Sequence, residues 1–469
     1  MKNQLPNSST PIRINLFFML LMLTSIFLIT PESKSQNKRL PNIILILTDD
    51  QGYHDVSYYG TKDILTPHID ALCKDGIRLD NYYTNAPVCS PTRASLMSGR
   101  YPDRVGVPGL IRSNPHNNWG YLDPKAELLP AKLKSAGYHT AHIGKWNLGL
   151  ESPNLPNEKG FDLFHGWLED MMEDYVIKRR NGKNYMRLND VEIDPPGHAT
   201  DLFTNWASEY IESMKNQPQP FFLYLAYNAP HFPVQPPLSW LNRAKQLHPE
   251  ISDKRANLVA FIEHLDDGIG KVIQSLKKTG QYENTLIIFS SDNGGHLPDQ
   301  PNNGPLRSGK QSMYEGGLKV PAFAVWPEKI KAGSVSQQLN VTMDVYPTLL
   351  EVAGIASTGP LDGRSFLPTL LGQEIMESRT LYFVRREGGL TYGGKAYHAI
   401  RQGDWKLLQN NPYQPLELYN LKEDPLEFNN LIIQYPEKVK ALNNSLMLYI
   451  QDGGKTPWQK PNVDTTSIN

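Results

Sequence analysis

Five short runs of apolar residues, rich in β-branched and aromatic side chains, predict buried strands along the chain. They are Asn42–Leu47, His139–Ile143, Phe221–Ala226, Thr285–Phe289 and Val320–Val325. Because these runs are nearly continuous in apolar character rather than alternating, we expect strands that are covered on both faces, as in parallel sheets.

Apolar residues with helical spacing occupy segments between these runs. Such segments are Glu127–Ala136, Leu202–Met214 and Leu258–Leu276, and the last is followed by two lysines and Gly280, as is common where a helix ends. The alternation of strand and helix predicts an α/β domain over residues 36–375. Its sheet should be large, mixed and mostly parallel, with helices on both faces.

The pattern changes near residue 376. Four short candidate strands, LYFVR, AYHAIRQ, WKLLQ and LELYNL, are separated by turns rich in Gly, Asp, Asn and Pro, with no helix between them. This spacing predicts a small antiparallel sheet, followed by a helix near Pro436–Gln451. We therefore expect a C-terminal α+β subdomain over residues 376–469.

The N-terminus carries a targeting pattern. Basic residues precede an apolar run, Leu16–Thr30, and the small residues Ser33 and Ser35 follow it. This order is typical of a secretory signal peptide, here over residues 1–35. A retained anchor is the alternative, but about 20 apolar residues are normally needed to cross a bilayer. We expect an exported protein, periplasmic or secreted, with no stable membrane insertion after cleavage.

Charge and cysteine content narrow the classes of function. Lys and Arg number 47 and Asp and Glu number 48, so the net charge is −1. Broad nucleic-acid binding needs a basic field, and this balance argues against it. The sequence has two cysteines, Cys73 and Cys89, which are too few for a disulfide framework.

Ionisable and amide residues follow four of the predicted strands at their carboxyl ends. They are Asp49 and Asp50 after the first run, Lys145 after the second, His231 after the third, and Asp292 and Asn293 after the fourth. One such cluster alone would be ordinary loop chemistry, and Asp292-Asn293-Gly294 alone would be a turn. Four clusters at one edge favour a binding site, because ligands of open α/β sheets bind there.

The residue types point to a hard cation. Adjacent carboxylates such as Asp49 and Asp50 repel each other at a buried strand end unless a cation or a proton compensates. A further carboxylate and an amide oxygen complete an all-oxygen set, which suits Ca²⁺, or less readily Mg²⁺, rather than zinc. Lys145 and His231 add a positive charge and a proton donor. This combination suits hydrolysis of a strongly anionic ester.

Cys89 lies just before a predicted helix from about Pro91 to Met97. Free N–H groups and the helix dipole favour an anion or a nucleophile at such a place, and Arg93 adds a positive charge. An incidental thiol at the start of a helix is the alternative.

The run CSPTRASLMSGR resembles the signature of the type I sulfatases of the alkaline-phosphatase-like superfamily, in which the Cys of C-x-P-x-R is oxidised to Cα-formylglycine. Thr92 is a mild departure, since Ser or Ala is commoner there. The similarity extends from PNIILILTDDQG to LYNLKEDPLEFNNL, which covers nearly the whole mature chain.

The resemblance implies a role for each matching residue. The implied calcium ligands are Asp49, Asp50, Asp292, Asn293 and the formylglycine made from Cys89. It implies further that Arg93 holds the formylglycine, that Lys145 and Lys310 bind the sulfate, and that His231 lies beside the leaving group. A formylglycine-generating maturation enzyme is the implied partner.

One position departs from the family pattern. The family usually reads G-K-W-H, and here Asn147 replaces that histidine, which is thought to help deprotonate the covalent hemiacetal sulfate. Asn cannot take up a proton. Either His139 or His142 substitutes, or turnover is slower, or the pocket is built differently. Asn147, His142 and His296 are weaker candidates for substrate contacts.

The mechanism that the resemblance implies uses hydrated formylglycine. One hydroxyl attacks sulfur, and the other then expels sulfate and restores the aldehyde. We expect a sulfate ester of a carbohydrate, from a polysaccharide or a glycosaminoglycan, as the substrate. The alternatives are a phosphonate or phosphate diester hydrolase of the same superfamily and, because of Asn147, a pseudoenzyme that binds sulfated glycans.

Overall fold

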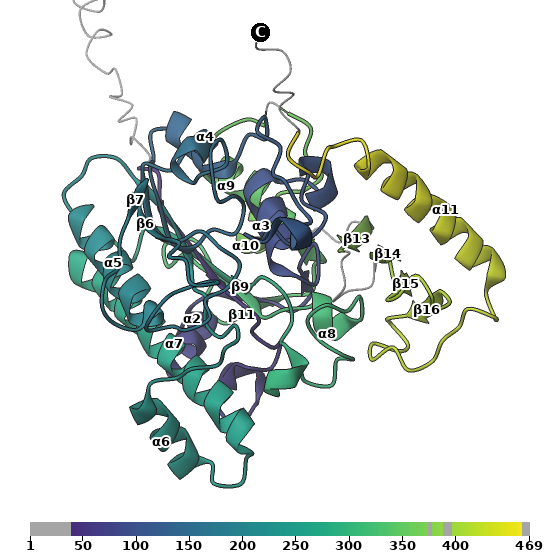
Figure 1. Cartoon of the computed structure of the whole chain (residues 1–469), viewed down its shortest axis with the longest axis horizontal. Helices are drawn as coiled ribbons and strands as arrows, with labels where there is room; N and C mark the ends of the chain where they lie inside the picture. Colours follow the sequence, from purple (N-terminus) through teal and green to yellow (C-terminus); the bar gives the residue numbers. More distant parts are fainter. Residues whose placement is uncertain (1–38, 358, 374–377, 388–395, 462–469) are drawn as a thin grey trace, which may run out of the picture. The chain divides into compact units, whose positions relative to one another are not determined.

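The computed structural model describes residues 39–357, 359–373, 378–387 and 396–461. The predicted signal peptide lies outside these residues. From Leu40 onward the chain forms one compact unit around a ten-stranded sheet (Figure 1). The predicted fold class is confirmed, because this sheet is mixed, helices cover it, and a separate four-stranded antiparallel sheet follows near the C-terminus.

The large sheet has the strand order β11-β2-β10-β9-β1-β8-β4-β5-β6-β7. Its central strands β9, β1, β8 and β4 run parallel to one another. The strands span Asn42–Thr48 (β1), Ile77–Leu79 (β2), His139–Lys145 (β4), Leu163–Trp167 (β5), Met186–Leu188 (β6), Val191–Glu192 (β7), Phe221–Ala226 (β8), Thr285–Ser291 (β9), Ala322–Val325 (β10) and Ser334–Ser336 (β11). A separate pair joins β3 (Tyr82–Tyr83) to β12 (Asn340–Val341).

One strand differs from the sequence-based expectation in its direction. The continuous apolar run at Val320–Val325 indicated a parallel strand, but β10 runs antiparallel to β9, with Ala322 opposite Ser290. Its four residues are all buried. The run is therefore apolar because both of its faces are covered, and coverage does not fix the direction of a strand.

Two groups of helices cover the two faces of the sheet (Figure 1). One group comprises α2 (Pro67–Asp75), α5 (Ala199–Ser213) and α7 (Asp253–Thr279), with α6 (Leu238–Leu247) packed against α7. The other comprises α3 (Cys89–Ser98), α4 (Leu129–Ser135), α9 (Val345–Val352) and α10 (Leu367–Leu370). The long helix α7 begins where the Ser252 hydroxyl accepts the Arg255 N–H at 3.1 Å and ends at Gly280, with φ 73°.

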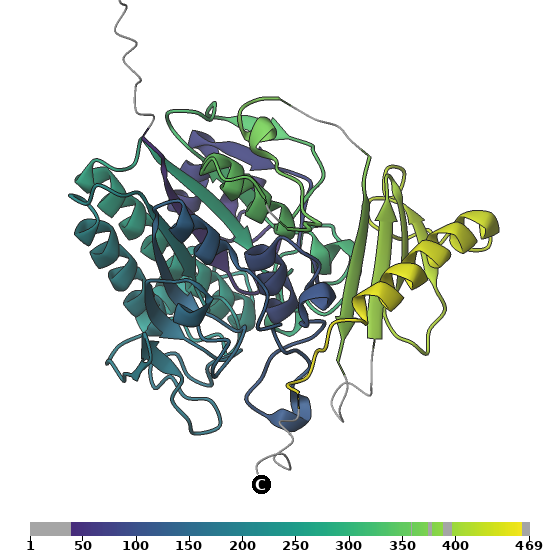
Figure 2. The same cartoon turned by 90° about the horizontal axis from the view of Figure 1, so that it is seen from above.

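The C-terminal sheet is held between a helix and the larger sheet's domain (Figure 2). Its strands are β13 (Thr380–Arg386), β14 (Ala396–Gln402), β15 (Trp405–Gln409) and β16 (Glu417–Asn420), and α11 (Pro436–Gly453) covers the outer face. Leu442 and Leu446 of α11 pack on Ile400 and Leu407. The inner face, which includes Phe383, packs on side chains of the larger part of the chain such as Tyr83 and Met313.

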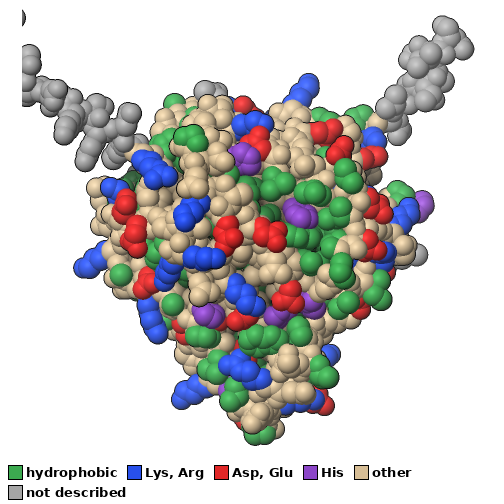
Figure 3. Space-filling view, turned by 90° about the vertical axis from the view of Figure 1, so that its left-hand side faces the viewer, with side chains coloured by type: hydrophobic (Ala, Val, Ile, Leu, Met, Phe, Trp, Pro, Cys, Tyr) green, Lys and Arg blue, Asp and Glu red, His purple; other side chains and the backbone are tan. Residues whose placement is uncertain are grey.

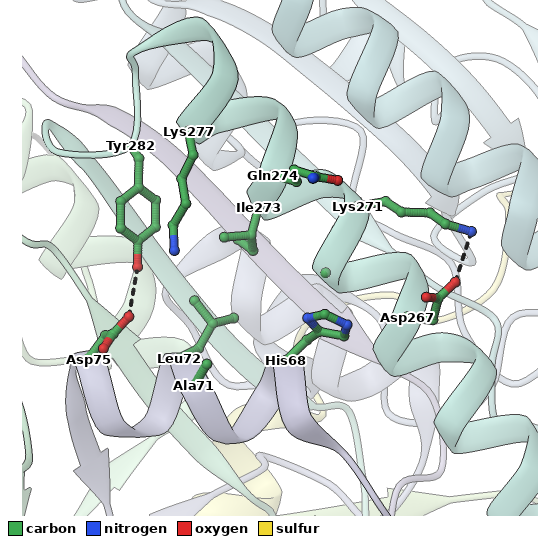
Figure 4. A pocket seen from close by; sticks show the side chains of 11 residues that line it. His68, Ala71, Leu72, Asp75, Asp267, Lys271, Ile273, Gln274, Lys277 and Tyr282 are labelled. Atoms are coloured by element: carbon green, nitrogen blue, oxygen red, sulfur yellow. Dashed lines mark hydrogen bonds and ion pairs between the residues drawn. The ribbon is translucent and has the colours of Figure 1, made fainter.

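The outer side of the first helix group carries a groove of about 420 Å³ between α2 and α7 (Figure 4). Leu72 and Ile273 contribute apolar surface to it, and Lys277 and the Tyr282–Asp75 pair are among its polar residues. None of the described residues that line this groove belongs to the polar clusters predicted from the strand ends. Elsewhere on the surface, acidic and basic side chains are interspersed over the face in Figure 3.

Candidate active site

The ends of four neighbouring strands bring the polar residues together. Asp49 and Asp50 follow β1, Asp292 and Asn293 follow β9, Lys145 ends β4, and His231 lies in the loop after β8. All of these side chains are buried. Asp50 has φ 67°, a left-handed conformation that Asp adopts more readily than most residues.

Cys89 is the first residue of α3 and lies at the middle of this group. The structure begins the helix at Cys89, not at Pro91 as the sequence indicated. The Cys89 thiol donates to Asp49 Oδ1 at 3.3 Å, and Lys310 Nζ lies 3.8 Å from Cys89 Sγ. Cys89 is only 1% exposed. Burial, together with the charges of Asp292 and Asp49, raises the pKa of the thiol well above its usual value.

Arg93 lies one helical turn after Cys89 and joins two strand ends. Its Nη2 and Nε donate to Asp292 Oδ2 at 2.8 and 3.1 Å, and its Nη1 donates to the Lys145 carbonyl at 3.0 Å. Burial and the nearby Asp49 raise the pKa of Asp292 to about 7, although Arg93 opposes this shift. Arg93 therefore holds Asp292 in place beside a second carboxylate.

Two lysines pair with the two carboxylates that follow β1. Lys145 Nζ lies 2.5 Å from Asp49 Oδ2, and Lys310 Nζ lies 2.7 Å from Asp50 Oδ1. Burial opposes ionisation of Asp49, but the charges of Lys145 and its neighbours outweigh it and lower the Asp49 pKa. Likewise, burial disfavours the charged form of Lys310, yet Asp50 raises its pKa overall. Both lysines therefore carry a positive charge inside the site.

His231 presents one free ring nitrogen to this group. Its Nδ1 donates to the Phe232 carbonyl at 2.6 Å, and its Nε2 lies 3.7 Å from Asp50 Oδ2. Burial and the charge of Lys310 lower the His231 pKa to about 4. At neutral pH the ring is therefore uncharged, with an unprotonated Nε2 that faces Asp50.

The side chains fit a hard metal cation. Ligand atoms of Asp49, Asp50, Cys89 and His231 lie within 4.8 Å of one another. Asn293 Oδ1 is buried and has no hydrogen-bond partner among the described residues, while Asn293 Nδ2 donates to Asp50 Oδ1 at 2.7 Å. A flip of this amide would turn its oxygen toward the carboxylates. Clustered carboxylates and an unpaired amide oxygen are what Ca²⁺ or Mg²⁺ binds.

A family model described as Sulfatase matches residues 41–355, and these residues include every side chain of the site just described. The chain belongs to the sulfatase family. A second model, described as N-sulphoglucosamine sulphohydrolase, C-terminal, matches residues 308–452. Members of the family hydrolyse sulfate esters. As a member of the family, this chain is a sulfuric ester hydrolase.

Individual relatives agree with the family match. The N-acetylgalactosamine-6-sulfatase of Mus musculus is 33% identical over an alignment 391 residues long, and the match spans 78% of this chain and 71% of the relative. A protein named Sulfatase from Formosa agariphila is 29% identical over an alignment 516 residues long, and the match spans 92% of each chain. The crystal structure of Ps i-CgsB in complex with k-i-k-neocarrahexaose has a TM-score of 0.82 and 31% identity, and covers 90% of this chain and 95% of that one.

In this sulfatase, Asn147 is fully buried and adjoins the residue that follows Cys89. The Ser90 hydroxyl donates to Asn147 Oδ1 at 2.8 Å, and Asn147 Nδ2 donates to the Ile111 carbonyl at 3.0 Å. The Ile111 N–H in turn donates to Ser90 Oγ at 3.0 Å. Both ends of the amide are thus used in holding neighbouring segments together.

The other candidate histidines, His142, His139 and His296, have hydrogen-bond partners other than Cys89 and Ser90. His142 is fully buried, stacks on Tyr224 with ring centroids 4.6 Å apart, and makes a 3.1 Å contact with the Tyr224 carbonyl through Nδ1. Burial lowers the pKa of His142 to about 3. His139 pairs with the Tyr210 hydroxyl at the start of β4, and His296 pairs with Asp299 at 2.6 Å.

Some residues that support the site through hydrogen bonds were not predicted from the sequence. Ser90 is one of them, since it stands at a variable position of C-x-P-x-R. Tyr175 is another, because its hydroxyl donates to the carbonyls of Asn228 and His231 at 2.8 and 2.9 Å. Nothing in the sequence marks Tyr175, which lies more than 50 residues before the loop that it supports.

Proposed function

We propose that this sulfatase cleaves a sulfate ester of a carbohydrate outside the cytoplasm, using Cα-formylglycine made from Cys89. One observation carries the proposal: Cys89 lies at the N-terminus of α3, within reach of both Asp49 and Lys310. Carboxylate and ammonium groups on two sides of one side chain can orient a nucleophile and neutralise an anionic substrate.

The unmodified thiol is poorly suited to this task. Its raised pKa keeps it protonated, and a thiol cannot later expel sulfate from itself in the way that a geminal diol can. Hydrated formylglycine supplies two hydroxyl groups on one carbon. Arg93 and Asp292 fix the first turn of α3 on which that carbon would sit.

Charge balance supports binding of a sulfate group together with a cation. The site holds three ion pairs, each between a positive side chain and a carboxylate. They are Arg93 with Asp292, Lys145 with Asp49, and Lys310 with Asp50. When bound, a divalent cation adds positive charge that polarises the sulfate oxygens. The residues that would hold the cation are Asp49, Asp50, Asp292, Asn293 and the residue derived from Cys89. Calcium is favoured over magnesium because it accepts more oxygen ligands. Lys145 and Lys310 would then face the sulfate.

Two side chains, those of Lys310 and His231, can each transfer a proton during the reaction. Lys310 keeps a proton at Nζ and can give it to the departing alcohol oxygen. His231 offers an unprotonated Nε2, which can receive a proton from an attacking hydroxyl or share one with the leaving group.

The named relatives support a sulfated glycan as the substrate. One is an N-acetylgalactosamine-6-sulfatase, and another was crystallised with k-i-k-neocarrahexaose. The pattern at residues 1–35 supports export to the periplasm or the medium, and a formylglycine-generating enzyme would be the maturation partner. Within the described residues, no helix combines the length and the apolar character that a membrane crossing requires.

The test is sulfate release from a panel of sulfated polysaccharides, their oligosaccharides and a small aryl sulfate, with the protein co-expressed with a formylglycine-generating enzyme. Cys89→Ala should abolish release, while Cys73→Ala should leave it unchanged. Cys73 is a matched control, because it is equally buried but lies in α2, away from the site.

Three results would contradict the proposal. Full activity of a folded Cys89→Ala variant would remove the mechanism. Faster cleavage of phosphate or phosphonate esters than of sulfate esters would indicate the diester-hydrolase alternative. Glycan binding without sulfate release, in protein whose Cys89 conversion is confirmed by mass, would indicate a pseudoenzyme.

A further inference from the structure

Lys310 lies on a loop rather than on a strand end, so something other than the sheet must fix its position. The loop contains two residues with left-handed backbone, Ser308 at φ 64° and Gln311 at φ 75°. It is also tightly folded, because a Cβ on Gly317 would lie 2.1 Å from the Ser312 carbonyl oxygen. Backbone of this kind persists only where the surroundings hold it.

Arg385 of the C-terminal sheet binds the carbonyl of Gln311, the residue that follows Lys310. It lies on β13, is fully buried, and donates from Nη1 to the Gln311 carbonyl at 3.3 Å. The Gln311 N–H donates to the Pro87 carbonyl at 2.9 Å, two residues before Cys89. The left-handed residue beside Lys310 is thus tied to β13 on one side and to the Cys89 segment on the other.

Glu387 extends the same connection to Leu110, a neighbour of Cys89. Its Oε2 accepts from Arg385 Nη2 at 3.0 Å, and its Oε1 accepts the Leu110 N–H at 3.3 Å. Leu110 packs against Val88 and Cys89. Although burial opposes its ionisation, Arg385 and Arg112 lower the pKa of Glu387, so the pair is ionic.

We propose that Arg385 and Glu387 are positioning residues for the reaction, which set the place of the Lys310 ammonium relative to Cys89 from a different sheet. The inference rests on the proposed role of Lys310 in sulfate binding. The guanidinium suits this task because its fork donates to a carbonyl and a carboxylate at once. A lysine at position 385 could keep the ion pair with Glu387 but could not also reach the Gln311 carbonyl.

The experiment compares Arg385→Lys with a matched substitution, Arg379→Lys. Arg379 is also buried, lies just before β13 and donates from two nitrogens to Asp344, but among the described residues it makes no hydrogen bond or ion pair with the Lys310 loop. Each substitution is made alone and in a Lys310→Ala background. Hydrolysis of a small aryl sulfate, inhibition by inorganic sulfate and melting temperature are measured for every variant.

We expect Arg385→Lys to lower kcat/KM on the order of tenfold and to weaken inhibition by inorganic sulfate, since small misplacements of a catalytic group are costly. In the Lys310→Ala background, Arg385→Lys should have little further effect on kcat/KM or on sulfate inhibition. Both substitutions act on the same interaction, that of the Lys310 ammonium with the sulfate, so their effects do not add. Arg379→Lys should lower the melting temperature without weakening sulfate inhibition.

The outcomes separate this inference from the proposed function. Equal losses from Arg385→Lys with and without Lys310 would overturn it, and so would unchanged sulfate inhibition in a folded Arg385→Lys variant. If Lys310→Ala is too slow for kinetics, the same comparison is made by binding. Affinity for inorganic sulfate is then measured in Cys89→Ala protein, with Arg385→Lys added in the presence and in the absence of Lys310. If Lys310→Ala itself leaves sulfate binding intact, the proposed role of Lys310 fails, and the inference fails with it.

Discussion

The side chain of Asn147 joins the β4 end to two other segments around Cys89. It has φ 53°, a left-handed conformation that Asn tolerates better than most residues, and its amide binds Ser90 and the Ile111 carbonyl at once. A single-residue departure from a family motif thus has a visible structural use here.

Replacement of Asn147 by Ala should lower the free energy of unfolding by about 2–4 kcal/mol, because two buried hydrogen bonds are lost and their partners stay buried. Denaturant unfolding measures this. Asn181→Ala is the matched control, since Asn181 has nearly the same backbone, with φ 50°, but is exposed. Equal losses for the two variants would mean that backbone conformation alone, and not the tie to Ser90, sets the cost.

Helix α5 depends on a histidine at its N-cap. Thr200 donates its N–H to His198 Nδ1 at 3.2 Å, and His198 Nε2 contacts the Gln235 carbonyl at 3.0 Å. These two contacts require the neutral ring with its proton on Nε2. Burial lowers the pKa of His198 to about 4, so protonation at acid pH would remove the cap.

The pKa shift has a defined effect on stability. Between about pH 6.5 and 4 the unfolded chain binds a proton at His198 that the folded protein does not, so the free energy of unfolding falls as pH falls. We expect this one residue to contribute about 2 kcal/mol of that fall. His198→Asn keeps a capping oxygen but does not titrate, so its denaturant-unfolding curve should lose less stability between pH 6.5 and 4. Parallel pH profiles for the two proteins would contradict the assignment.

The site lies where separate parts of the fold meet. Strands β1, β4 and β9, the loop after β8 and helix α3 each contribute a side chain, and the C-terminal sheet supports Lys310 through Arg385. A cation bound by Asp49, Asp50, Asp292 and Asn293 would join the ends of β1 and β9 and relieve repulsion between their carboxylates.

Calcium should therefore stabilise the entire fold. Saturation at about 100 times the dissociation constant adds about 2.7 kcal/mol to the free energy of unfolding, so the melting temperature should rise with Ca²⁺ and fall with a chelator. Sulfate release should fall with the chelator as well. Asp50→Asn is the control, because its melting temperature should respond little to calcium. A melting temperature that ignores calcium in the wild-type protein would contradict the proposed metal site.

The strands and their polar ends could be predicted because each depends on a local pattern. The run Phe221–Ala226 matches β8, and AYHAIRQ and WKLLQ match β14 and β15. The carboxyl-end rule then placed Asp49, Lys145 and Asp292 at one edge. By contrast, the direction of β10 depends on its partners and the position of Arg385 depends on how two sheets pack. Neither the direction of β10 nor the position of Arg385 can be predicted from a short stretch of sequence.

The burial of Cys89 has a consequence for the order of events in the cell. The thiol sits under the completed fold, enclosed by Val88 and Leu110 and by charged side chains from two strand ends. A maturation enzyme of the proposed kind would reach this thiol only while the chain is still unfolded, because the folded protein leaves Cys89 1% exposed. On that proposal, oxidation would precede folding, and a chain that folded first would keep its thiol.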